Sequence, residues 1–398
     1  MIATTTKPAL QSPFQRLAKL IEGVQPGRPA IDLGVGEPRH PMPAFVGPVI
    51  AETLAGFGRY PAIKGTPAFR AAVSGWLDRR YGLEGWIDPE TAILPLNGSR
   101  EGLFFAALGA RDYSPKRPDR PAVLLPNPFY FAYAAGAEAA GAEAVMLAAR
   151  PGSALPDLDA LDPALVARTI AIYFASPANP DGTVATHADW LALIAWARAN
   201  DVYVFADECY SEIYREAAGA PAGVLAAARE TGSCERVITF NSLSKRSNLA
   251  GLRCGFAAGD SVFLSRWTSL RNIAAPQVPT PVQAVGAAAY SDEAHVIENR
   301  RLYDAKFALA ERLLGPVFGD VVPAGGFFLW LDVAQFGGSE AAALKLWRDA
   351  GVRAVPGAYL AAPEPGGRNA AAGFLRLALV DDIAVTEEAL TRLAATFA

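Results

Sequence analysis

The first two thirds of the chain alternate short apolar runs with longer stretches of helical periodicity, such as residues 190–200. Most of the apolar runs are continuous, which is typical of strands that are buried on both faces of a sheet. The alternation predicts an α/β fold, with a mainly parallel seven-stranded sheet and helices on both faces. We expect the seven strands at residues 92–96, 122–125, 144–147, 169–175, 202–206, 237–240 and 254–258.

The pattern changes near residue 285, where the regular alternation of strands and helices ends. A long helical stretch at 292–314 is followed by an apolar run at 325–331, a helix at 340–350 and a second run at 374–379. This order predicts a smaller α+β domain. We therefore divide the chain into an N-terminal segment that packs with the small domain (1–45), a large domain (46–284) and a small C-terminal domain (285–398).

Composition and charge narrow the class of protein. Of the 398 residues, 52% are hydrophobic and 19% are charged, which indicates a globular protein with a large core. The net charge of -4 and the absence of a basic stripe argue against nucleic-acid binding. The sequence contains no run of about 18 apolar residues, so we expect no membrane span. Residues 1–27 lack the apolar core of a signal peptide. We expect a cytoplasmic protein.

The cysteines and histidines also agree with a cytoplasmic protein and argue against a metal site. The three cysteines form no closely spaced pair, which favours a reducing compartment. The three histidines are far apart and lack the spacing of metal ligands, so we expect no metal site.

Polar residues directly follow five of the predicted strands. In open α/β sheets, ligands bind outside the carboxyl ends of the strands, so these five segments should meet at one ligand. The segments are residues 97–100, 127–128, 179–180, 207–208 and 242–245.

Lys245 follows an apolar strand and stands in a cluster of hydroxyl residues that includes Ser242 and Ser244. Arg253 comes eight residues later, with a glycine on either side. This pattern suits a protein that presents an amine to an aldehyde while it holds a phosphate beside it. We predict that Lys245 carries pyridoxal phosphate as a Schiff base, its pKa lowered by burial or nearby positive charge. An ordinary lysine after a strand is the simpler alternative.

Three further strand ends offer contacts for the ring of such a cofactor. Asp207 could pair with the pyridinium nitrogen and keep it protonated, whereas a capping aspartate would look the same in sequence. Tyr210 and Asn179 could donate to the ring oxygen. Tyr130 could stack on the ring, with Phe129 as the competing candidate.

Other residues suit the phosphate and the substrate. Ser99 and Arg100 precede a predicted helix at 101–110, and free N–H groups at a helix N-terminus bind phosphate. Ser242 and Arg253 would add a hydroxyl and a guanidinium. Arg376 could bind a substrate carboxylate through two parallel hydrogen bonds, or could form a structural ion pair. The Gly-rich stretch around Gly36 suits a lip beside the substrate.

Taken in order, seven of these residues resemble the signature of the class I/II aminotransferases, which belong to fold type I of the pyridoxal-phosphate enzymes. The resemblance extends from about residue 31 to residue 379 and rests on Asn179, Asp207, Tyr210, Ser242, Lys245, Arg253 and Arg376.

The resemblance implies a role for each residue. Lys245 would hold the cofactor and move a proton to and from the substrate Cα. The ring contacts would come from Asp207, Asn179, Tyr210 and Tyr130, the phosphate contacts from Ser99, Arg100, Ser242 and Arg253, a further cofactor contact from Ser244, and the substrate contacts from Gly36, Asn179 and Arg376. Tyr60 matches a tyrosine that reaches the phosphate of the neighbouring subunit, which implies a homodimer with shared active sites.

Within that family, four stretches are most similar to proteobacterial N-succinyldiaminopimelate aminotransferases: residues 36–38, 60–62, 126–130 and 242–248. This similarity implies transfer from N-succinyl-LL-2,6-diaminopimelate to 2-oxoglutarate in lysine biosynthesis, with aspartate, alanine or aromatic donors left open. One stretch departs from the pattern. Residues 271–275 read Arg-Asn-Ile-Ala-Ala where that branch carries an Arg-Thr-Tyr-His-Gly-like sequence. Arg271 keeps the charge that could read a distal carboxylate.

Three alternatives compete with this interpretation. Residues 242–245 fit the S-x-x-K pattern of serine acyl enzymes, but the S-D-N and K-T-G partners are missing. A pyridoxal-phosphate-dependent β-lyase, decarboxylase or cyclising lyase would share the same ring contacts and stays open, because the protein only selects which bond breaks. A ligand sensor of a transcription regulator would need a DNA-binding extension, for which residues 1–30 leave no room.

Overall fold

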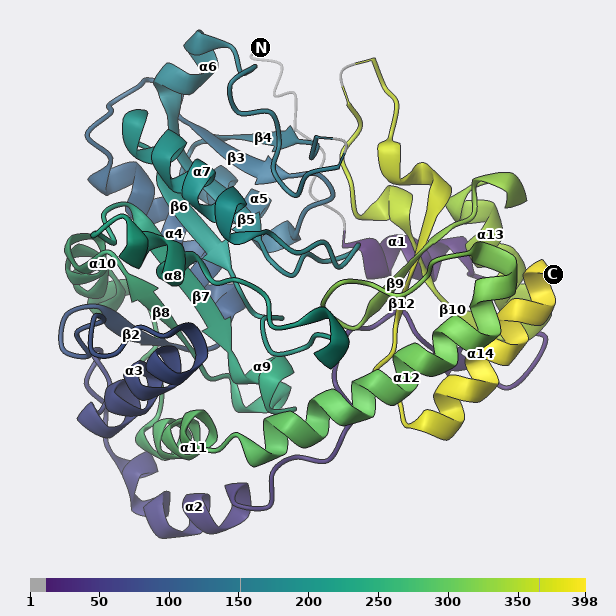
Figure 1. Ribbon diagram of the computed structural model, residues 1–398, viewed down its shortest axis with the longest axis horizontal. Coiled ribbons are helices and arrows are strands. Elements are labelled where there is room, and N and C mark those ends of the chain that lie inside the picture. The colour runs from purple at the N-terminus through teal and green to yellow at the C-terminus, as the bar shows by residue number, and fades with distance from the viewer. Residues whose placement is uncertain (1–11, 151, 365) are drawn as a thin grey trace, which may run out of the picture.

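The computed structural model describes residues 12–150, 152–364 and 366–398, and within these ranges a sheet of seven strands organises the larger lobe (Figure 1). The strand order is β2-β8-β7-β6-β5-β3-β4. β8 runs antiparallel to both of its neighbours, β2 and β7, and the other described neighbours in this sheet are parallel. The strands are β2 (Ile93–Leu96), β3 (Ala122–Pro126), β4 (Glu143–Leu147), β5 (Thr169–Ala175), β6 (Tyr203–Asp207), β7 (Val237–Ser242) and β8 (Gly255–Gly259). The predicted mainly parallel sheet is confirmed.

Helices cover both faces of this sheet, and successive strand residues face opposite cores. Val204 belongs to the buried cluster under one set of helices, while its neighbour Phe205 belongs to the cluster on the other face. The first face is covered by α3 (Pro67–Tyr81), α7 (His187–Ala199), α8 (Val224–Glu230) and α11 (Thr280–Ser291). The second face is covered by α4 (Ser99–Tyr113), α5 (Phe131–Ala139) and α10 (Ser261–Ala274).

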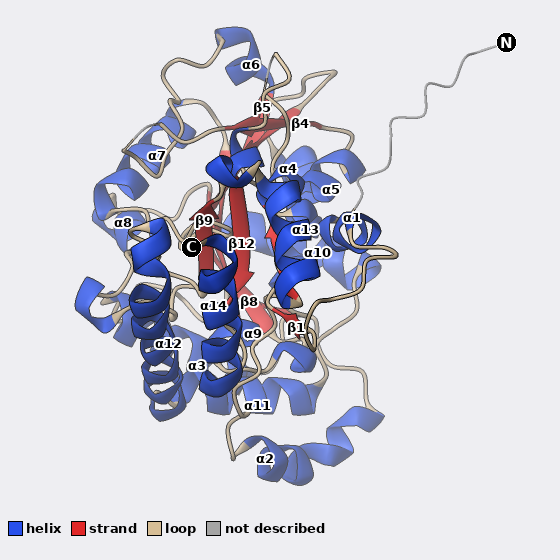
Figure 2. Ribbon diagram, turned by 90° about the vertical axis from the view of Figure 1, so that its right-hand side faces the viewer, coloured by secondary structure: helices blue, strands red, loops and turns tan. Residues whose placement is uncertain are grey.

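The smaller lobe has its own sheets and its own core. A three-stranded antiparallel sheet contains β9 (Phe328–Asp332), β12 (Phe374–Ala378) and β11 (Val355–Pro356), and a short parallel pair joins β1 (Ile31–Asp32) to β10 (Val352–Arg353). Around them pack α12 (Ala294–Phe318), α13 (Ser339–Ala350) and α14 (Ile383–Phe397); α12 and α14 lie side by side in Figure 2. The stretch predicted as a helix at 292–314 is thus α12, which begins two residues later and continues past Pro316.

The N-terminal segment packs against this smaller lobe. In α1 (Pro13–Leu20), Leu17 belongs to a buried cluster with Val355 and Tyr359. These contacts agree with the expected place of the N-terminal segment beside the small lobe. The boundary at residue 285, which remains a proposal, falls inside α11, whose Val285 and Tyr290 belong to the buried cluster of the large lobe. The helix α2 (Val46–Thr53) stands at the foot of the large lobe in Figures 1 and 2.

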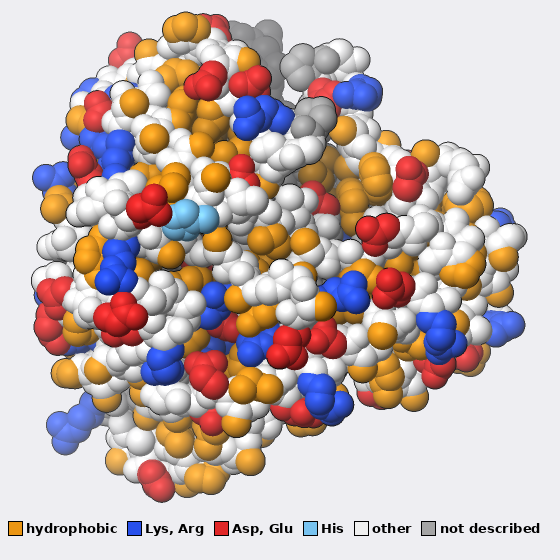
Figure 3. Space-filling view, viewed as in Figure 1, with side chains coloured by type: hydrophobic (Ala, Val, Ile, Leu, Met, Phe, Trp, Pro, Cys, Tyr) orange, Lys and Arg blue, Asp and Glu red, His pale blue; other side chains and the backbone are white. Residues whose placement is uncertain are grey.

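The long helix α12 connects the two lobes. It begins beside the end of α11 and runs across to the small lobe (Figure 1). On the face seen in Figure 3, acidic and basic side chains are interspersed, without a large patch of one sign. Among the described residues, no helix combines the length and the apolar character that a membrane crossing requires.

Candidate functional site

A cavity of about 1220 Å³ lies where the carboxyl ends of the parallel strands face the small lobe. It is lined by residues from β6, from the turn after β7, and from β12 in the small lobe. The sequence-predicted residues that line it are Gly36, Ser99, Arg100, Tyr130, Asn179, Asp207, Tyr210, Ser242, Ser244, Lys245, Arg253 and Arg376. The structure therefore brings together segments that are up to 340 residues apart, counted from Gly36 to Arg376.

Two of the residues named from the sequence lie outside this lining. Tyr60 is 98% exposed, on the surface after α2. Arg271 is fully buried in α10 and forms an ion pair with the Glu101 carboxylate. Glu101 itself lines the cavity, so the charge of Arg271 is compensated by a protein acid rather than presented to a ligand.

Lys245 lies in α9 (Leu243–Arg246), the single turn of helix that follows β7. Ser242 caps this turn, because its Oγ accepts a hydrogen bond from the Ser244 amide at 3.2 Å. The Lys245 Nζ donates to the carbonyl oxygen of Gly36. Burial lowers the pKa of Lys245 to about 8, and the charges of Arg376 and Arg100 act in the same direction. A substantial fraction of the amine is therefore neutral and nucleophilic near physiological pH.

Asp207 ends β6 and is 8% exposed. The hydroxyl of Tyr133 donates to its Oδ2 at 2.6 Å, and the Cys209 amide donates to Oδ1 at 3.2 Å. Burial raises the pKa of Asp207, while these hydrogen bonds favour its ionised form. A carboxylate has about four acceptor positions, so it can still accept from a cationic ring N–H.

Tyr133 was missed by the sequence analysis. It lies in α5, and its ring stacks on Tyr173 with 4.6 Å between the centroids. Tyr133 is followed by alanine and glycine residues in an apolar helix, so nothing in the local sequence marks it as the partner of a carboxylate 74 residues away.

Arg376 projects from β12 and is 4% exposed. Its Nη1 donates to Asn179 Oδ1 at 3.0 Å and its Nη2 donates to the Gly34 carbonyl at 2.8 Å. Its Nε is buried and has no hydrogen-bond partner among the described residues. The ring of Phe328 lies 4.4 Å below the guanidinium. A buried cation that is bound only to neutral groups, with its Nε–H still free, is suited to receive a carboxylate.

A cradle for a phosphate lies at the start of α4. The helix begins at Ser99, two residues before the predicted start, so Ser99 and Arg100 belong to its first turn. Gly98 at the N-cap has φ +82° and offers no side-chain cap, which leaves the first backbone N–H groups available. A Cβ at Gly98 would collide with the Arg253 guanidinium, whose Nη2 donates to the Asn97 carbonyl at 3.3 Å.

Aromatic rings form much of the remaining wall. The Tyr210 ring lies 5.8 Å from Lys245 Nζ and packs edge-on against Phe327 and Phe328. Tyr130 lines the cavity, and its hydroxyl accepts from Arg100 Nε at 2.6 Å. Burial raises the pKa of both tyrosines, so their hydroxyls remain donors at neutral pH.

The donor set fits pyridoxal phosphate at three places. Lys245 offers the amine for the aldehyde, Asp207 offers an anionic acceptor for the ring nitrogen, and the cradle at Gly98 with Arg253 offers donors for the phosphate. Four basic side chains face the cavity: Arg100, Lys245, Arg253 and Arg376. None of the four forms an ion pair with a carboxylate in the part of the chain that the structure describes.

Comparisons with known proteins agree with this chemistry. The model of the family described as aminotransferase class I and II matches residues 28–395. The chain is 32% identical over 393 residues to an LL-diaminopimelate aminotransferase of Syntrophobacter fumaroxidans, which covers 96% of this chain and 95% of that protein.

Solved structures give the same likeness. An aminotransferase from Neisseria meningitidis matches with a TM-score of 0.91 and 35% identity, covering 98% of each chain. A probable N-succinyldiaminopimelate aminotransferase from Thermus thermophilus matches with a TM-score of 0.81 and 26% identity, covering 97% of this chain and 100% of that one.

Proposed function

We propose, from the premise that this chain belongs to the class I and II aminotransferases, that it moves an amino group from a long donor with a distal carboxylate to 2-oxoglutarate. Aminotransferase activity and the use of pyridoxal 5'-phosphate follow from family membership. The donor, the acceptor, the role of each residue and the dimer are our proposal. The preferred donor is N-succinyl-LL-2,6-diaminopimelate, which would place the enzyme in lysine biosynthesis.

The observation that carries the proposal is the set of four basic side chains at one cavity that form no ion pair with a carboxylate among the described residues. A buried charge is costly unless a partner compensates it, and Arg376 is the buried member of this set. A phosphate at Arg253 and an α-carboxylate at Arg376 would each supply a counter-charge. Arg100, which is exposed and already oriented by Tyr130, leaves a cationic group for a further carboxylate.

Each of these side chains would have its own role when cofactor and substrate are bound. Pyridoxal phosphate supplies an electron sink that weakens the bonds at the substrate Cα. Asp207 would keep the ring nitrogen protonated, Asn179 and Tyr210 would donate to the ring oxygen, and Tyr130 would pack on the ring. Ser242, Ser244 and Arg253 would hold the phosphate end together with the first-turn N–H groups of Ser99 and Arg100, which leaves the Arg100 guanidinium to the donor.

Proton transfer would depend on two side chains. Arg376 would fix the α-carboxylate, with Asn179 and the Gly36 backbone beside it, so that the Cα–H bond has one orientation. The Nζ of Lys245 would then take the Cα proton and hold it for return. Its lowered pKa, about 8, suits an amine that must accept a proton near neutral pH.

The size of the cavity supports a long donor. At about 1220 Å³ it exceeds the range of roughly 300–1,000 Å³ that is usual for small-molecule sites. A cofactor with alanine would leave much of this volume to water. A donor with a succinyl group or a second amino acid end would fill more of it and bring a carboxylate toward Arg100.

We also propose a homodimer in which Tyr60 completes the site of the partner, in keeping with a cytoplasmic enzyme. Tyr60 is 98% exposed, and Leu54 and Phe57 in the same segment are 60% and 52% exposed. An apolar surface of this kind suits contact with a second copy. Mixing the inactive Lys245→Ala chain with a weakened Tyr60→Phe chain should restore activity, because each mixed dimer would hold one site with both native residues. Mixtures that give only the sum of the separate activities would contradict shared sites.

The donor specificity is tested with a panel of amino acids and 2-oxoglutarate as acceptor. We expect the highest kcat/KM for N-succinyl-LL-2,6-diaminopimelate, followed by LL-diaminopimelate, with glutamate formed in equal amount to the donor consumed. Arg100→Gln should lower kcat/KM for these donors more than for alanine. Equal kcat/KM for alanine and the long donors would overturn the proposed specificity, and release of ammonia without glutamate would favour a lyase.

A further inference from the structure

The segment at residues 34–41, which we call the strap, lies against both of the principal cationic side chains of the site. The Gly34 carbonyl accepts from Arg376 Nη2 at 2.8 Å, and the Gly36 carbonyl accepts from Lys245 Nζ. Asn248, three residues beyond Lys245, donates to the Pro41 carbonyl at 3.4 Å. The strap therefore supplies the carbonyl oxygen to which the Lys245 amine donates.

His40 fixes the far end of the strap through a chain of hydrogen bonds. Lys306, which is 1% exposed, places its Nζ 2.6 Å from His40 Nε2 and donates to the Leu379 carbonyl at 3.0 Å. The His40 Nδ1 lies 2.6 Å from Asn299 Oδ1. The Asn299 Nδ2 donates to the backbone carbonyls of Lys245 and Arg246, at 3.4 and 3.5 Å.

The chemistry of the groups decides which atom donates and which accepts in each of these hydrogen bonds. A lysine ammonium only donates, so His40 Nε2 accepts and its Nδ1 carries the hydrogen. Nδ1 then donates to Asn299 Oδ1, which orients the Asn299 amide with its N–H groups toward the carbonyls of α9. Burial lowers the pKa of His40, which keeps the ring neutral as this arrangement requires.

We propose that His40 is a positioning residue for the amino-transfer reaction: through the relay Lys306–His40–Asn299 it holds the backbone of Lys245, and through the strap it holds the carbonyl that orients the Lys245 amine. The inference rests on the proposed role of Lys245 as the amine that binds the cofactor. His40 is not among the residues that line the cavity. It would act on the backbone and on the amine of Lys245, and both affect where the reacting nitrogen lies.

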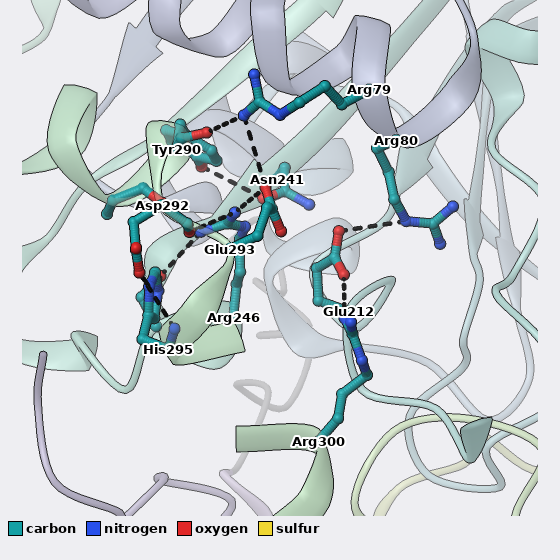
Figure 4. A network of polar contacts seen from close by, with 12 residues as sticks. Arg79, Arg80, Glu212, Asn241, Arg246, Tyr290, Asp292, Glu293, His295 and Arg300 are labelled. Carbon is teal, nitrogen blue, oxygen red and sulfur yellow. Dashed lines mark hydrogen bonds and ion pairs between the residues drawn. The ribbon is translucent and has the colours of Figure 1, made fainter. Parts of the chain in front are cut away.

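The surroundings of α9 show why such a relay would be effective. Figure 4 shows the polar network around Arg246, the residue that follows Lys245 in α9. In it, Arg246 forms an ion pair with Glu293 at 2.9 Å, and His295 forms one with Asp292. The His295 Nε2 also lies 2.8 Å from the hydroxyl of Ser247. His295, Asn299 and Lys306 are spaced along one side of α12, so a single rigid helix carries the contacts to α9 and to the strap.

Four variants of full-length holoenzyme test the relay. His40→Asn keeps an N–H where Nδ1 stood, His40→Gln keeps an acceptor for Lys306 but loses the bond to Asn299, and His40→Phe loses both. Asn299→Ala removes the next link. His187→Phe is the matched control, because His187 lies on the surface and pairs with Glu230. The readouts are kcat, KM, the melting temperature, and the pH midpoint of the cofactor's visible absorbance.

We expect His40→Phe and His40→Gln to lower kcat by about 10- to 100-fold, the size of loss that a misplacement near 1 Å produces. KM should change little, the absorbance midpoint should move, and His40→Asn should recover most of the lost kcat. Adding Asn299→Ala to His40→Phe should cause no further loss, because both changes break one relay. The His187→Phe control should match the wild type.

Three results would overturn the inference: wild-type kcat and absorbance midpoint in His40→Phe, rescue by His40→Gln instead of His40→Asn, or a loss seen only in the melting temperature. Borohydride reduction of the wild-type holoenzyme, followed by peptide mapping, separates this failure from failure of the proposed function. If the cofactor is found on Lys245 and His40→Phe changes neither kcat nor the absorbance midpoint, the relay is rejected and the role of Lys245 stands. Cofactor found on another lysine rejects the role of Lys245 and the relay with it.

Discussion

The two sides of Lys245 differ in whether their basic side chains form ion pairs with protein carboxylates. On the cavity side, Arg376 and Lys245 bind neutral carbonyl and amide oxygens, and no protein carboxylate pairs with them among the described residues. On the opposite side, the network of Figure 4 pairs its arginines with acids: Arg246 with Glu293, and Arg300 with Glu212.

This difference separates a surface that awaits a ligand from one that is complete without it. A buried cation without an acid partner is unfavourable until an anion arrives, so the cavity side gains most from phosphate and carboxylate. The paired charges behind Lys245 already have their partners and hold the turn that carries it. Substitutions on the cavity side should therefore change catalysis. Substitutions that break an ion pair of the network without contacting α9 should change stability.

The largest expected effect is that of Lys245→Ala. Removing the amine should lower kcat by about ten-thousand-fold, since both cofactor attachment and proton transfer are lost. The Lys19→Ala variant is the control, because Lys19 is an exposed residue of α1. Steady-state kinetics at saturating cofactor provide the measurement, and a Lys245→Ala enzyme within tenfold of the wild type would break the comparison at its centre.

Arg376→Gln should have the next largest effect. Loss of a buried charge pair with the α-carboxylate costs about 3 kcal/mol, which corresponds to roughly a hundredfold fall in kcat/KM. The fall should be specific to donors with an α-carboxylate, so a simple amine of similar length serves as the internal control. An equal loss for both kinds of donor would assign Arg376 to folding instead of recognition.

The pH dependence of cofactor capture should show a tenfold effect per pH unit. Burial lowers the pKa of Lys245 to about 8, so below pH 8 the neutral fraction of the amine falls about tenfold for each unit. Capture of pyridoxal phosphate by the cofactor-free chain should rise up to about pH 8 and then level off. N-acetyl-lysine methyl ester under the same conditions gives the ordinary amine for reference. If the capture rate of the protein continues to rise up to the same pH as that of the reference amine, the pKa of Lys245 is not lowered.

Arg300→Gln should have the smallest effect on catalysis. It breaks the 2.9 Å ion pair with Glu212, which is 3% exposed and keeps Arg80 as its other partner. We expect the free energy of unfolding to fall by about 1–3 kcal/mol, the usual cost of leaving a buried polar group short of a partner. Urea unfolding measures this change, and kcat should stay within about threefold. A kcat loss as large as that of Arg376→Gln would erase the distinction between the two sides.

The sequence predicted the large lobe and the strand-end residues well because both depend on local patterns. Most of the seven strands are continuous apolar runs. Asp207 ends one of them, and Lys245 lies in the turn of helix that follows another. The parallel arrangement then brings those ends together without further information. The one antiparallel strand, β8, could not be foreseen, because strand direction depends on how the chain returns after α9.

The residues that sequence analysis missed are those defined by distant contacts. Tyr133 bonds to Asp207 across 74 residues, and His40 meets Lys306 across 266. Neither pair has a spacing or a motif that marks it. The helix α4 likewise begins at Ser99, earlier than predicted, because Gly98 adopts a positive φ that lets the turn start at once.

The most direct test of the central claim is to locate the amine that carries the cofactor. The holoenzyme is reduced with borohydride, digested, and the peptide with the cofactor's added mass is sequenced by mass spectrometry. The account predicts that the added mass lies on Lys245, in the peptide that follows β7, and that Lys245→Ala yields no such peptide. Added mass on a different lysine, or an unchanged yield in Lys245→Ala, would contradict it.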